Sequence, residues 1–123
     1  MTSFDFSNST TKSSGVFWQG AGYSHCSHLD VIACGLHGIE IYGTSSSVMS
    51  TTVHISGQSR FSATPNGYAA KLTECALVVF DGCIMEGTQG ILLNGNDNRA
   101  LTFNNVYQES TSGNVFLNGG TSS

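Results

Sequence analysis

Residues 76–95 read ALVVFDGCIMEGTQGILLNG, and residues 100–119 read ALTFNNVYQESTSGNVFLNG. Both segments open with apolar residues at alternate positions, pass through Gly or Asn, and close on the same LNG triplet. Self-similarity at a fixed step is typical of a repeat architecture. The two segments are therefore interpreted as adjacent copies of one structural unit.

Related segments occur along the whole chain. The closing half of each copy begins with Gly, and the steps between these glycines are 23, 29, 23 and 23 residues. The closing halves start at Gly15, Gly38, Gly67, Gly90 and Gly113, and the opening halves start at Phe4, Leu29, Val53, Val78 and Leu101. Five copies of a two-strand unit thus fill residues 1–123 as a single domain. We expect a fragment of a longer chain, because no capping segment follows or precedes the copies.

Each half-copy is short, alternates with period two, and is bounded by Gly, Asn or Ser, which predicts a β-strand. A repeat of about 23 residues is only about half as long as the repeat that forms a propeller blade, which argues against a propeller. The chain also lacks the sequence framework of a leucine-rich repeat. The step fits one coil of a parallel β-helix. The sequence therefore predicts an all-β parallel β-helix, or solenoid, of about five coils, each of roughly 23–25 residues.

The alternation also predicts which side chains face inward. The inward pairs are Phe4 and Phe6, Leu29 and Val31, Val53 and Ile55, Val78 and Phe80, Leu101 and Phe103, then Val16 and Trp18, Ile39 and Ile41, Tyr68 and Ala70, Ile91 and Leu93, Val115 and Leu117. A tight corner should follow the opening strands, because residues that accept positive φ recur there. These are Asn8, Gly57, Gly82 and Asn105. The one long step contains the sole proline, so we expect an outward loop within SRFSATPNGY, residues 59–68.

Composition excludes several classes of function. Charged residues make up only 10%, the net charge is −4, and there are four Lys and Arg residues, which argues against a nucleic-acid partner. No run reaches the roughly 20 apolar residues of a membrane span. The first residues, MTSFDFSNSTTKSS, lack the pattern of a signal peptide. We expect neither a nucleic acid nor a membrane as partner.

Four cysteines form two pairs with a spacing of eight residues: Cys26 with Cys34, and Cys75 with Cys83. Small buried thiols are the favoured interpretation, because free Cys is among the most buried residue types. The string HCSH at residues 25–28, with Cys34 and His37 nearby, lacks the two correctly spaced ligand pairs of a zinc finger. No metal and no other cofactor is predicted.

The segments LTFNNVYQES, GNVFLNG and LVVFDGCIMEGTQGILLNG, with their counterparts over nearly the whole chain, resemble the right-handed parallel β-helix of phage tailspikes and pectate-lyase-like proteins. The resemblance implies a homotrimer in the virion, at the end of a phage tail, that binds bacterial surface polysaccharide and in many cases cleaves it. Two alternatives stay open. One is a non-catalytic structural or adhesive shaft of a viral tail fibre. The other is a cellular pectate-lyase-like enzyme, which the missing signal sequence disfavours.

Glu86 and Glu109 are the first catalytic candidates. They are 23 residues apart in adjacent copies, so their backbones should lie about 5 Å apart. Retaining glycosidases use two carboxyl groups at a similar separation, one as acid and one as nucleophile. Hydrolysis is therefore favoured over a lyase reaction. In the same outward column we expect Lys12, His37 and Phe61, and the alternative is that both Glu side chains are solvated surface residues.

Asp30 and His54 are the second candidates, as neighbours one coil apart that form an acid–base pair, with a solvated surface pair as the alternative. His37, Tyr107 and Arg60 are the predicted substrate-binding residues. A third outward column is largely apolar and predicts the interface of a homotrimer. Its members are Phe17, Glu40, Ala69, Leu92 and Phe116.

Overall fold

The structure is a computed structural model that describes residues 2–5, 13–95, 97–111 and 116–118. These residues form twelve β-strands, and none of them lies in a helix that could cross a membrane. The strands are β1 Thr2–Asp5, β2 Val16–Gln19, β3 Gly22–Ser27, β4 Leu29–Cys34, β5 Ile39–Tyr42, β6 Ser50–Ser56, β7 Arg60–Thr73, β8 Cys75–Asp81, β9 Ile84–Asn94, β10 Thr102–Asn104, β11 Tyr107–Ser110 and β12 Phe116–Asn118.

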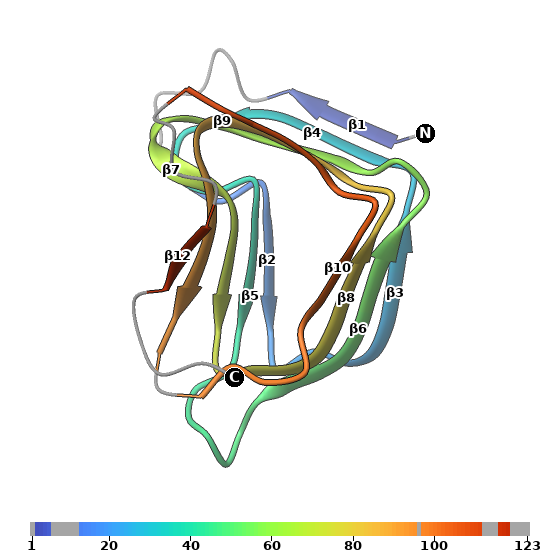
Figure 1. The fold of residues 1–123 in the computed structure, drawn as a ribbon, viewed down its shortest axis with the longest axis vertical. Helices are drawn as coiled ribbons and strands as arrows, with labels where there is room; N and C mark the ends of the chain where they lie inside the picture. The colour runs from blue at the N-terminus through green and yellow to red at the C-terminus, as the bar shows by residue number, and fades with distance from the viewer. Residues whose placement is uncertain (1, 6–12, 96, 112–115, 119–123) are drawn as a thin grey trace.

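The strands wind into a solenoid with three sides (Figure 1). One side is a four-stranded sheet in the order β10-β8-β6-β3. The eight-stranded sheet covers the other two sides, because β7 and β9 bend around the corner between them (Figure 1). The first halves of β7 and β9 pair with β4 and β11, and their second halves pair with β5 and β12. All strands pair in parallel, so the predicted parallel β-helix is confirmed, with three strands per turn and about four turns.

The interior is filled by alternate residues of the strands, as predicted for the central copies. Val53, Ile55, Val78 and Phe80 of the four-stranded sheet are all 1% exposed or less, and Ile39, Ile41 and Ile91 on another side are equally buried. Phe4 is 47% exposed on β1, which lies at the edge of its sheet. Phe6 and Val115 lie outside the described residues, as does the side chain of Leu117.

The predicted equivalence of Leu29 and Val53 is wrong. Val53 on β6 pairs with Ser24 of β3, whereas Val31 on β4 pairs with Phe61 of β7. The structural counterpart of β6 in the preceding turn is thus β3, GYSHCS, which carries no large aliphatic side chain. Strand signals based on apolar alternation miss such a segment. As a result the sequence predicts two strands per turn where the fold has three.

At one corner of the solenoid, every described turn has a residue in the left-handed conformation at the same position. The φ angles are 55° at His28, 58° at Gln58, 65° at Gly82 and 49° at Asn105. The predicted tight corner is therefore confirmed at Gly82 and Asn105, and at Gly57, whose φ is 69°. Asn8 lies outside the described residues. We call His28, Gln58, Gly82 and Asn105 the corner ladder. A left-handed residue turns the chain sharply, so the corner ladder fixes where each strand of the four-stranded sheet ends.

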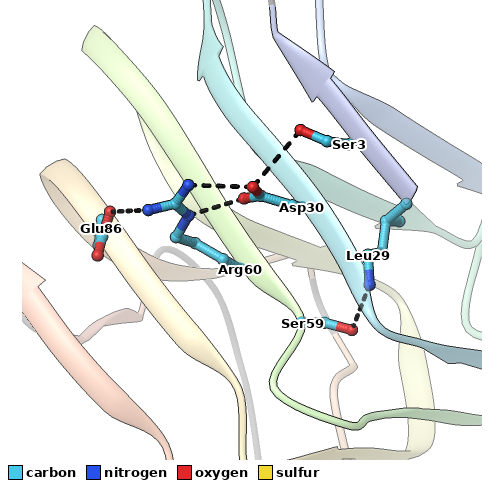
Figure 2. A network of polar contacts seen from close by, with 6 residues as sticks. All are labelled: Ser3, Leu29, Asp30, Ser59, Arg60 and Glu86. Atoms are coloured by element: carbon cyan, nitrogen blue, oxygen red, sulfur yellow. Dashed lines mark hydrogen bonds and ion pairs between the residues drawn. The ribbon is translucent and has the colours of Figure 1, made fainter. Parts of the chain in front are cut away.

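Small polar side chains inside the corners satisfy backbone groups. The Ser59 hydroxyl donates to the Ser56 carbonyl at 2.7 Å and accepts from the Leu29 N–H at 3.2 Å, the second of which Figure 2 shows. Ser50 does the same at another corner, donating to the Tyr42 carbonyl at 2.8 Å and accepting from the Ala21 N–H at 3.1 Å. These bonds remove the cost of burying unpaired backbone polar groups.

The long sequence step has two structural sources. The larger is an insertion at residues 44–49, between β5 and β6, which protrudes from the corner at the bottom of Figure 1. The smaller is a register shift between Ala63 and Tyr68 within β7. The segment around Pro65 was predicted to be an outward loop, but it runs within β7, and the protruding loop lies elsewhere.

Candidate functional site

Charged side chains gather on the outer surface of the side formed by β4, β7, β9 and β11. Strand pairing places Asp30, Arg60, Ile84 and Tyr107 in one column along the solenoid, one from each turn. Glu86 and Glu109 lie in a neighbouring column, two positions further along their strands. We call the group Asp30, Arg60, Glu86, Tyr107 and Glu109 the polar face.

Asp30 and Arg60 form a bidentate ion pair across adjacent strands (Figure 2). The Arg60 Nε donates to Asp30 Oδ1 at 2.7 Å, and Nη2 donates to Oδ2 at 3.0 Å. The Ser3 hydroxyl also points to Oδ2, at 3.5 Å. The hydrogen bond from Arg60 to Asp30 is the main reason why the pKa of Arg60 is raised above its ordinary value. Both carboxylate oxygens of Asp30 are thus occupied by a permanent cation, which suits a positioning role better than proton transfer.

Glu86 and Glu109 lie directly opposite each other on β9 and β11. The two carboxylates have different partners. Arg60 Nη1 lies 4.0 Å from Glu86 Oε2 (Figure 2), whereas the Tyr107 hydroxyl donates to Glu109 Oε2 at 3.2 Å. The charge of Glu109, followed by that hydrogen bond, raises the pKa of Tyr107, so its phenol stays protonated at neutral pH. Two nearby carboxylates in unlike environments are the arrangement that divides acid and base roles in hydrolases.

The predicted contact between Asp30 and His54 is wrong. Asp30 lies on β4 in the eight-stranded sheet, whereas His54 lies on β6 in the four-stranded sheet, opposite His25 and Val79. The prediction treated β4 and β6 as successive turns of one side, although they lie on different sides of the solenoid.

His37 does not lie in the polar face. Its side chain is buried, with 5% exposed, and its Nδ1 accepts a hydrogen bond from the Tyr68 N–H at 3.1 Å. Burial is the main cause that lowers the pKa of His37, opposed by Glu40 and assisted by Lys71. A buried ring that accepts a hydrogen bond from the backbone suits a role in packing, which argues against the predicted contact of His37 with substrate. Phe61 and Lys12 were predicted in the same outward column as His37. Phe61 is also buried, with 0% exposed, and Lys12 lies outside the described residues.

The predicted apolar stripe is interrupted by an ion pair. In the register of this side, Phe17 pairs with Glu40, Glu40 with Lys71, and Lys71 with Leu92. The Lys71 Nζ lies 3.0 Å from Glu40 Oε1. Lys71 therefore holds the place predicted for Ala69, which is 0% exposed.

Phe116 also leaves the stripe, because its backbone pairs with Ile91 rather than with Leu92. Its side chain lies outside the described part of the chain. Phe17 is 53% exposed, and Leu92 is partly buried. The homotrimer remains a prediction, without the continuous apolar column that suggested it.

The cysteines are free thiols, and three of them are buried, as predicted. Burial raises the pKa of Cys75 to about 12 and those of Cys34 and Cys83 to about 11. Cys75 pairs with Ser50 of the preceding turn, and its Sγ donates to the Thr73 carbonyl at 3.3 Å, as Ser50 does to the Tyr42 carbonyl. Thiols with such high pKa values are poor nucleophiles, which fits a packing role. Among the described residues, no group of three or more His, Cys, Asp or Glu side chains could hold a metal ion.

Two surface depressions accompany these features. One of about 200 Å³ lies beside the Asp30–Arg60 ion pair and is lined by Asp30, Gln58, Arg60 and Ile84. A larger groove of about 560 Å³ lies beside the 44–49 insertion and is lined by Ser46, Ser47, Val48, Met49, Thr51, Ala76 and Arg99. Sequence reasoning missed this groove, although the Ser-rich run GTSSSVMS at residues 43–50 is a recognisable loop signal.

No protein-family model matches this chain, and no curated protein or solved structure shows significant similarity to it. The assignment as a parallel β-solenoid rests on the strand pairing alone.

Proposed function

We propose that this chain is a polysaccharide-binding segment of a phage tailspike, and that the saccharide lies along the polar face. The observation that carries the proposal is the stacking of Arg60, Glu86, Tyr107 and Glu109 over three successive turns of one open side. Polar side chains that recur along the solenoid axis suit an extended, repeating polymer. The polymer would be bacterial surface polysaccharide, bound by a homotrimer in the virion.

The residue types of the polar face suit sugars. Tyr107 is 59% exposed, and an exposed ring presents an apolar surface to the C–H groups of a sugar while its hydroxyl stays hydrogen-bonded. The carboxylates of Glu86 and Glu109 accept hydrogen bonds from sugar hydroxyls, and the Arg60 guanidinium donates them. The adjoining depression of about 200 Å³ gives room for a substituent of the polymer beside the Asp30–Arg60 pair.

In the full protein, Glu86 and Glu109 would cleave a glycosidic bond. Paired positions on adjacent strands are about 4.8 Å apart, which is close to the separation of the carboxyl groups in retaining glycosidases. Glu109 would be the general acid, because the partner of its carboxyl group is the neutral Tyr107 phenol rather than a cation. Glu86, whose Oε2 lies 4.0 Å from Nη1 of Arg60, would be the nucleophile.

The test combines binding and cleavage with purified bacterial capsular and O-antigen polysaccharides. Tyr107→Ala should weaken binding, measured by calorimetry, about fivefold, from the loss of roughly 1 kcal/mol of ring contact. Glu86→Gln and Glu109→Gln should bind but release no reducing ends. Asp81→Asn is the matched control, because Asp81 is a carboxylate on β8 of the four-stranded sheet. Undiminished cleavage by both Gln variants removes this pair from the mechanism, and binding that survives Tyr107→Ala unchanged removes the polar face.

A second candidate is a non-catalytic shaft, and one observation favours it. Neither of the two depressions described above is lined by Glu86 or Glu109, so within the described residues neither depression shields the pair from water. A purely structural shaft would bind no polysaccharide, and an adhesive shaft would bind it but release no reducing ends. Release of reducing ends that Glu86→Gln and Glu109→Gln abolish decides for the first candidate.

A further inference from the structure

We propose that His25 and His54 form a two-histidine site for a transition-metal dication on the outer surface of the four-stranded sheet. His25 on β3 and His54 on β6 are direct partners in a parallel ladder. Residues paired in this way have backbones about 4.8 Å apart. Their rings are 5.2 Å apart between centroids and are tilted by 40°. At that spacing, one nitrogen of each ring reaches a common ion at the usual Zn–N distance of about 2.0–2.1 Å after small side-chain rotations.

The orientation of one ring is already fixed. The His25 Nε2 shares a hydrogen bond of 2.8 Å with the Ser56 hydroxyl, which comes from the neighbouring strand β6. Metal-binding histidines usually hold their second ring nitrogen in such a bond, because it sets the tautomer and aims the other nitrogen at the ion. Nδ1 of His25 is therefore the ligand atom, and Nε2 donates to Ser56 in the metal-bound form.

The other candidate ligands nearby do not join this site. Cys26 follows His25 on β3, so it points to the opposite face of the sheet and packs against the core. His28 lies beyond the end of β3, at the left-handed corner. Alternation along β3 thus explains why the HCSH string does not make a four-ligand zinc site. The alternation instead leaves His25 and His54, one from each of two turns, on the solvent side of the sheet.

Two imidazoles without a carboxylate select among metals. Imidazole suits Zn²⁺, Cu²⁺ and Ni²⁺, whereas Ca²⁺ and Mg²⁺ require oxygen ligands. Water completes the coordination of an ion held by only two side chains. Both histidines are exposed, so the ion exchanges freely with solvent.

The site has a structural consequence for the solenoid. Among the described strands, β3 is the terminal member of the four-stranded sheet and pairs with β6 on one side only, as Figure 1 shows. An ion held by His25 and His54 cross-links β3 to β6. Because the ion binds the folded form, it raises the unfolding temperature, and the rise grows with the logarithm of the free ion concentration once that exceeds the Kd.

The test uses the untagged chain and Zn²⁺ in a non-coordinating buffer. Calorimetry should show one Zn²⁺ per chain, and differential scanning fluorimetry should show a rise in unfolding temperature. His25→Gln and His54→Gln should each lower the affinity at least tenfold and abolish the thermal shift. Ser56→Ala should lower the affinity about tenfold, as loss of an orienting partner does at other metal sites. His28→Gln, which removes an exposed histidine outside the pair, should change neither quantity.

Three results overturn the proposal. One is a loss of affinity in His28→Gln equal to that in His54→Gln, which would mean diffuse binding. Another is a stoichiometry of one ion per two chains, which would mean a site between copies. The third is the absence of Zn²⁺ uptake at millimolar concentration in a chain that the circular dichroism spectrum shows to be folded.

Discussion

Replacing Phe61 by Ala tests the register on which the polar face depends. The sequence places Phe61 in an outward column with Glu86, whereas the structure buries it completely between Val31 and Met85. A slip of one residue would turn every side chain of this strand to the opposite face. If Phe61 faced outward, Ser62, whose backbone pairs with that of Glu86, would face the interior. The burial of one side chain therefore reports on the orientation of its whole strand.

The magnitude follows from the burial. A phenyl side chain at 0% exposure loses its transfer free energy and leaves a cavity, so Phe61→Ala should lower the free energy of unfolding by about 3–5 kcal/mol. A chain of 123 residues has a total stability of roughly 6–18 kcal/mol. With a urea m-value of about 1.5 kcal/mol/M, the unfolding midpoint should fall by about 2–3 M at unchanged m.

The matched control is Phe17→Ala on β2, because Phe17 is the same residue type at 53% exposure. Its substitution should cost less than about 1 kcal/mol. Urea unfolding followed by circular dichroism measures both variants. Equal midpoints for the two variants, or a smaller loss for Phe61→Ala, would refute the described register and with it the outward position of Glu86.

Two further predictions concern pH and a close backbone approach. The pKa of His37 is lowered in the folded state, so on acidification the unfolded state takes up a proton at a higher pH than the folded state does. The contribution of His37 to the free energy of unfolding is therefore complete above the usual His pKa of 6.5 and is lost as the pH falls below it. Protonation also ends the bond in which Nδ1 accepts from the Tyr68 N–H, so thermal midpoints between pH 7.5 and 5 should fall less in His37→Asn than in the parent chain. Gly67→Ala should prevent folding, because a Cβ there would lie 1.1 Å from the Leu36 carbonyl oxygen. Gly22→Ala, where the nearest atom is 4.0 Å away, should fold normally, and soluble yield with circular dichroism compares the two; folded Gly67→Ala would contradict the described approach.

The sequence predicts the solenoid because its last two copies keep a regular step. The segments that carry Val78 and Leu101 lie 23 residues apart, and the structure pairs their strands as expected. The neighbouring positions of Glu86 and Glu109 follow from the same step, and the structure agrees. The third strand of each turn escapes prediction where its inward residues are Ser or Cys, because these give little apolar contrast.

The Asp30–Arg60 ion pair could not be found from a fixed repeat step. The two residues are 30 positions apart, since the 44–49 insertion lies between them. Ile84, which pairs with Arg60 on the next turn, is only 24 positions further on. The unequal steps show that the number of residues in a turn is not what holds neighbours together.

What holds neighbours together is the corner ladder. Gln58 and Gly82 both have left-handed φ angles, and each lies two residues before the paired positions Arg60 and Ile84. The ladder restarts the register at the same point on every turn, so an insertion at another corner lengthens the turn without displacing the next strand. A solenoid of this kind can therefore add loops such as 44–49, and the groove beside them, while the column that contains Arg60 stays in place. The polar face and the insertion groove can then change independently, because they lie on different segments of the turn and share no residue.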